Sequence, residues 1–169
     1  IKDLYGDSTI ITMLSVFPLG EIDFLNNTQF SLEHVKRGID FSRGLPVGKR
    51  RILTFHLNDF VTKEEFESKS KEQWEKEWSN IIKPALLEVA KYARFNNVEV
   101  KIETVPVPPF GDVHLEDERE YRGSKLYNLR NPFYLTNFWG FRQIRECGLG
   151  ICLDLCHRHT RYSKGCIPL

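Results

Sequence analysis

Short apolar runs alternate with longer amphipathic stretches along this chain, and this alternation restricts the possible folds more than any other feature. Four runs rich in β-branched and aromatic residues predict strands: 10–17, 51–57, 98–105 and 149–155. Three stretches with apolar residues at helical spacing predict helices: 31–44, 62–95 and 135–147. Strands that alternate with helices pair in parallel through right-handed crossovers. The sequence therefore predicts an α/β fold, as either an open doubly wound sheet or a closed barrel.

Particular residues predict where these helices begin, break and end. Ser31 can cap the first helix, and Thr62 with Glu65 forms a capping box for the second. Pro84 has no amide hydrogen, so it should kink the second helix or divide it in two. Gly148 can end the third helix. No glycine-rich phosphate loop follows a predicted strand, which weakens the open, nucleotide-binding alternative.

Composition limits the class of protein. The chain has 169 residues, and we expect one domain over 1–169, with a long loop at about 106–132 that is rich in proline and charge. The net charge of +1 provides no field that favours nucleic acid, and no apolar run is long enough to cross a membrane. The four cysteines all lie in the last fifth of the chain, which fits reduced thiols of a cytoplasmic protein better than a disulfide framework.

Polar residues stand near the carboxyl ends of three predicted strands. His56 ends the second strand, Glu103 the third, and Asp154 the fourth, with His157 just after it. In barrels and open parallel sheets alike, ligands bind at these strand ends. Two carboxylates with one or two imidazoles suit a divalent ion such as zinc, manganese or magnesium. The competing interpretation is that each strand-end carboxylate caps a helix or forms a salt bridge.

Alternation along the third strand restricts this interpretation. If Glu103 points toward a site, Lys101 and Glu99 lie on the same face of the sheet. They are tolerable there only if they pair with neighbours or reach solvent. On the fourth strand, Gly150 and Cys152 would be the small residues of that face.

The order of these motifs resembles one known superfamily. Gly150-Ile-Cys-Leu-Asp-Leu-Cys-His157 resembles the Asp-x-x-His strand of the xylose isomerase-like barrels, which include sugar isomerases and epimerases and endonuclease IV (AP endonuclease family 2). The strand ending in Glu103 is similar to the strand that carries a metal-ligand glutamate in that superfamily. Thr54-Phe-His56 resembles its earlier strand-end histidine, and Ser15-Val-Phe-Pro18 with Glu21-Ile-Asp23 resembles its second-strand segment.

This resemblance implies a (β/α) TIM-type barrel and a metal-dependent sugar isomerase or epimerase that acts on a small-molecule sugar, sugar phosphate or polyol. Glu103 and Asp154 would be metal ligands, and Glu103 would also move the proton. His157 would be a metal ligand or a substrate-binding group. His56 would line the substrate site, or be a ligand in the endonuclease branch. The metal would hold the substrate oxygens and stabilise negative charge that develops on them.

Two departures keep other functions open. The superfamily has eight strands and this chain predicts four, apparently the second to the fifth, so we expect an incomplete barrel whose free edges favour an oligomer. Phe17 stands where a zinc phosphodiesterase acting on abasic DNA would have a histidine, which makes nucleic acid the less favoured partner. A structural zinc held by cysteines and a catalytically inactive barrel fragment are the remaining alternatives.

Overall fold

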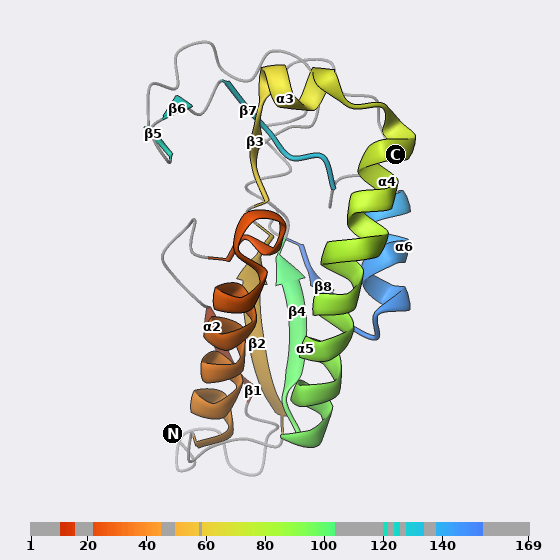
Figure 1. Cartoon of the computed structure of the whole chain (residues 1–169). Coiled ribbons are helices and arrows are strands. Elements are labelled where there is room, and N and C mark those ends of the chain that lie inside the picture. Colours follow the sequence, from red (N-terminus) through yellow and green to blue (C-terminus); the bar gives the residue numbers. More distant parts are fainter. Residues whose placement is uncertain are drawn as a thin grey trace.

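The core of the protein is a four-stranded parallel sheet. The computed structural model describes residues 11–15, 22–44, 50–57, 59–103, 120–121, 124–125, 128–133 and 138–153. The sheet contains β1 (Ile11–Ser15), β2 (Arg50–His56), β4 (Glu99–Glu103) and β8 (Gly150–Cys152), in the spatial order β1-β2-β4-β8 (Figure 1). Every pair is parallel, so the predicted α/β fold with parallel strands is confirmed. Among the described strands β1 and β8 are edges, and they close no barrel.

Three helices connect these strands and pack on one face of the sheet. They are α2 (Phe24–Gly44), α5 (Lys83–Phe95) and α6 (Phe138–Glu146). α2 packs on β1 and β2, α5 on β4 and α6 on β8, and α2 and α5 lie side by side in front of the sheet in Figure 1. Strands that follow one another in sequence and in space send their right-handed crossovers to the same face. The reversal of strand order that defines a doubly wound sheet does not occur among the described strands.

The two faces of the sheet differ in chemistry. Side chains of alternate residues, Leu53 and Phe55 on β2 and Val100 and Ile102 on β4, join the core beneath the helices. The residues between them face the other way, and on β4 these are Glu99, Lys101 and Glu103. The sequence prediction that these three share a face is therefore confirmed. β4 is held in the sheet by burial of Val100 and Ile102, although its other three residues are charged.

Helix α2 begins earlier than the sequence predicts. Ser31 was expected to cap it, but the helix starts at Phe24 and Ser31 is buried inside it, where its Oγ accepts a hydrogen bond of 2.8 Å from Asp23 N. Asp23 takes the capping role, because its Oδ1 accepts from Asn26 N at 3.0 Å. The backbone leaves helical geometry once, at Asn27. The end at Gly44 agrees with the prediction.

The long helical region predicted over 62–95 forms several pieces. Thr62 caps α3 (Lys63–Ser68), since Glu65 N donates to Thr62 Oγ1 at 3.2 Å, and this bond is one half of the predicted capping box. A reciprocal capping box that the sequence analysis missed, between Ser70 and Gln73, starts α4 (Lys71–Glu77). A π-helical segment η1 (Trp78–Ile82) then leads into α5, which has Pro84 in its first turn. The predicted interruption at Pro84 is confirmed. The π-helical turn just before it accommodates the backbone hydrogen bond that proline cannot donate.

Short strands occur inside the region expected to be a loop. β7 (Leu129–Arg130) pairs in antiparallel fashion with β3 (Val61–Thr62), and β5 (Glu120–Tyr121) pairs with β6 (Ser124–Lys125). The β3–β7 pair lies beyond the carboxyl ends of the main strands (Figure 1). Gly148 follows α6 with a φ of 79°, which is the left-handed conformation of a helix stop. None of the helices described has both the length and the apolar character that a membrane crossing requires.

Candidate functional site

His56 and Glu103 meet at the carboxyl end of the sheet. They are direct partners in the register of β2 and β4, and His56 Nε2 lies 3.4 Å from Glu103 Oε1. The His56 side chain is 8% exposed and the Glu103 side chain 19%, so both are mostly buried but still reach solvent. Two of the three strand ends that the sequence predicted to carry a site are therefore adjacent. A contact of this length becomes an ion pair when the imidazole is protonated.

The same row of the sheet continues onto β8. Cys152 is the register partner of Glu103, so His56, Glu103 and Cys152 lie in line across three strands. The Cys152 side chain is partly exposed. The sequence analysis placed Cys152 on this face only as a small neighbour. Because β8 lies next to β4, Cys152 is a third polar side chain in this row, beside Glu103.

Asp154 and His157 lie outside the described residues, as do Phe17 and the segment Ser15-Val-Phe-Pro18 beyond Ser15. Their predicted roles therefore remain predictions. Within the described parts of the chain, no three side chains of the histidine, cysteine, aspartate and glutamate types are grouped closely enough to hold a metal ion. His56 and Glu103 can supply two donors to a divalent ion.

A pair of buried carboxyls lies near the same end of the fold, and the sequence analysis did not identify it as a pair. Asp23 precedes α2, Asp59 follows β2, and neither is exposed. Asp59 Oδ1 accepts a hydrogen bond of 2.8 Å from Leu25 N, in the first turn of α2. Both carboxyls therefore hold the amino end of one helix, which is a structural role. In the sequence, the one sign of this role is that Asp59 follows a predicted strand and precedes a predicted helix.

The two carboxyls repel each other when both are ionised. Burial raises the pKa of Asp59 well above its ordinary value, the charge of Asp23 and a hydrogen bond between the two carboxyls raise it further, and the Leu25 and Phe24 amides oppose the rise. Asp59 Oδ2 is buried and has no hydrogen-bond partner among the described residues. Burial and the neighbouring carboxyl therefore both favour the protonated form of Asp59.

Comparison of the chain with protein-family models, curated proteins and solved structures finds no match.

Proposed function

We propose that this chain forms part of a (β/α)-barrel enzyme that uses a divalent metal to isomerise or epimerise a sugar, sugar phosphate or polyol. The observation that carries the proposal is the contact between His56 and Glu103 at neighbouring strand ends. Ligands of parallel β/α folds bind at this edge, where side chains from several strands converge. The resemblance of 150–157 to the Asp-x-x-His strand supplies the reaction class.

The arrangement of the sheet supports a barrel wall over other parallel folds. Consecutive strands are neighbours, and the helices that connect them cover a single face. The other face carries Thr54 and Lys101 along the strands and His56 and Glu103 at their carboxyl ends, as the polar interior and mouth of a barrel would. The four strands would be one half of the eight that close such a wall.

Glu103 would have two tasks in this reaction. Its carboxylate would bind the metal with Asp154 and move the proton between adjacent substrate carbons. His56, 3.4 Å away, would orient the carboxylate and bind a substrate hydroxyl. A bound divalent ion would supply electrostatic stabilisation of the oxygens next to the reacting carbon.

Metal binding tests the proposal directly. Titration of the chain with Mn²⁺ or Zn²⁺ in a calorimeter should give one saturable site. Glu103→Gln should weaken that site by at least about 100-fold, because losses of 10- to 100-fold already follow from changes to groups that only orient a ligand. Elemental analysis of the dialysed protein provides an independent measure of stoichiometry.

Glu99→Gln is the matched control. Glu99 lies on the same strand and the same face, at the opposite end of β4, where it pairs with Arg50 at 2.6 Å. Its substitution removes the same charge and should leave metal affinity unchanged. Absence of a saturable site, or equal losses in the two variants, would remove Glu103 from the metal site and refute the proposal.

A further inference from the structure

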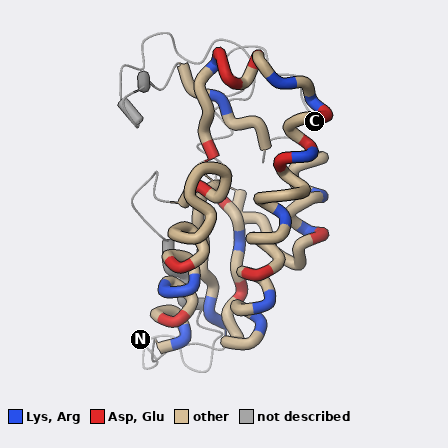
Figure 2. The backbone as a smooth tube through the Cα atoms, viewed as in Figure 1, with Lys and Arg blue, Asp and Glu red and all other residues tan. Residues whose placement is uncertain are grey.

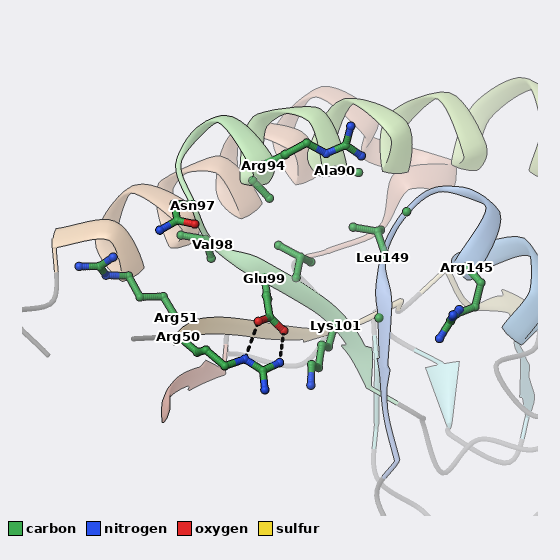
Figure 3. A pocket seen from close by; sticks show the side chains of 14 residues that line it. Arg50, Arg51, Ala90, Arg94, Asn97, Val98, Glu99, Lys101, Arg145 and Leu149 are labelled. Carbon is green, nitrogen blue, oxygen red and sulfur yellow. Dashed lines mark hydrogen bonds and ion pairs between the residues drawn. The ribbon is translucent and has the colours of Figure 1, made fainter. Parts of the chain in front are cut away.

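A basic cavity lies at the amino ends of the strands, at the other end of the sheet from His56 and Glu103. It has a volume of about 500 Å³, within the range of small-molecule sites. Its walls come from the amino ends of β2, β4 and β8 and the carboxyl ends of α5 and α6 (Figure 3). Figure 2 shows several basic positions at this lower end of the sheet. The cavity is therefore assembled from elements that are distant in sequence.

The charge of the lining is strongly unbalanced. Five cationic side chains line the cavity: Arg50, Arg51, Arg94, Lys101 and Arg145. Glu99 is the one carboxylate among the lining residues. Glu99 already accepts two hydrogen bonds of 2.6 Å from Arg50, from Nε and from Nη2. Within the described chain, the other four cations form no ion pair. Four positive charges around one cavity raise the local potential and favour an anion.

Helix dipoles explain part of this arrangement. Arg94 is in the last turn of α5 and Arg145 in the last turn of α6, where a cation is favourable without any ligand. That explanation does not reach Arg51 and Lys101, which are on strands. Arg51 Nε is buried and finds no hydrogen-bond acceptor in the part of the chain that the structure describes. A buried guanidinium donor without an acceptor is costly, and a bound anion could remove that cost.

Gly150 leaves room for one basic side chain, and Gly148 lies beside another. A Cβ on Gly150 would come within 2.9 Å of Lys101 Cγ, so the lysine stem lies flat across β8. A Cβ on Gly148 would lie 3.4 Å from Arg94 Nη2. Figure 3 shows Arg94 above the sheet with α5, and Lys101 and Arg50 on the opposite side of it. Cations therefore lie on both faces of the sheet at its amino end.

We infer that this cavity binds an organic phosphate with two or more phosphoryl groups. Four cations that form no ion pair with a described residue exceed what a single phosphate needs, and guanidinium groups bind phosphoryl oxygens through paired hydrogen bonds. Ala90, Ala93 and Leu149 provide an apolar wall for the rest of the molecule. The site is separate from the proposed metal site, at the opposite end of β4, and it would regulate or anchor the protein, with no part in the chemistry at Glu103.

Calorimetric titration with inorganic pyrophosphate tests this inference, at constant ionic strength and with EDTA present so that no metal can bridge. One saturable site per chain is expected. Each lost charge-assisted hydrogen bond corresponds to about tenfold in affinity or more, so Arg94→Gln with Arg145→Gln should weaken binding by at least about 100-fold. Glu99→Gln should tighten binding, because it removes the carboxylate and frees Arg50.

Arg142→Gln is the matched control for the helix substitutions. Arg142 is on α6, three positions before Arg145, but it is exposed, pairs with Glu146 and does not line the cavity. It should bind pyrophosphate like the unchanged protein. Thermal unfolding followed by circular dichroism identifies any variant that fails to fold. If the double variant Arg94→Gln with Arg145→Gln fails to fold, the single variant Arg94→Lys is titrated in its place. No saturable binding, or equal weakening by Arg142→Gln, would overturn the inference, whatever the result for metal binding at Glu103.

Discussion

Replacement of Trp78 by alanine is expected to lower the free energy of unfolding by about 3–5 kcal/mol, the range for removal of a fully buried large aromatic. Trp78 has no exposed surface, and its ring lies 5.7 Å from that of Phe133 and 5.6 Å from that of Trp139. Its Nε1 donates to Gln143 Oε1 at 3.2 Å. The side chain therefore joins the π-helical segment to α6 and to the segment after β7. Its loss would leave a cavity where three parts of the fold meet.

Denaturant unfolding followed by circular dichroism at 222 nm measures this effect without relying on tryptophan fluorescence. Trp78→Phe keeps a ring but loses the bond to Gln143, so it should fall between the wild type and Trp78→Ala. Phe95→Ala is the matched control, since Phe95 is 87% exposed and surface changes usually stay within about 0.5 kcal/mol. If Trp78→Ala costs no more than Phe95→Ala, the cluster does not stabilise the fold.

Much of the sheet could be predicted because its signals are local. The β-branched runs define β2 and β4 to within a few residues, and consecutive parallel strands with helical crossovers follow from the order of elements. Parallel pairing also places the carboxyl ends of β2 and β4 at one edge of the sheet, which is why His56 and Glu103 could be predicted to lie at that edge, although their direct contact was not predicted. Alternation then fixes Lys101 and Glu99 on the same face as Glu103.

Other features depend on contacts between distant segments. Ser31 resembles a helix cap in sequence, but Asp23 and Asp59 together hold an earlier start, and their proximity depends on how β2 leads into its loop. The two-residue strands β3 and β7 are too short to have a periodicity. The basic cavity likewise combines strand and helix ends that are far apart in sequence, so composition near neutrality conceals a local excess of positive charge.

The buried pair Asp23 and Asp59 should make stability fall as the pH rises. Burial and the neighbouring carboxyl raise the pKa of Asp59 in the folded protein above its ordinary value of 3.8, so the folded state binds more protons than the unfolded state. The stabilisation is complete below about 3.8 and is lost as the pH rises through the folded pKa. The slope should approach, and not exceed, about 1.4 kcal/mol per pH unit.

Asp59→Asn should abolish this dependence. The amide resembles the protonated carboxyl: its oxygen can still accept from Leu25 N, and its NH₂ group can donate to Asp23. The variant should match the wild type at low pH and become the more stable protein as the pH rises, because it never ionises. Urea unfolding at intervals between pH 4 and 9 gives both curves.

Glu33→Gln separates this effect from a general change in charge. Glu33 is on α2, the helix whose start Asp23 and Asp59 hold. It is exposed and accepts a hydrogen bond from Gln29, so its substitution removes one negative charge without affecting Asp23 or Asp59. This variant should retain the wild-type slope. If the wild type shows a flat profile, or if Asp59→Asn and Glu33→Gln have the same slope, then the pKa of Asp59 is not raised in the folded protein.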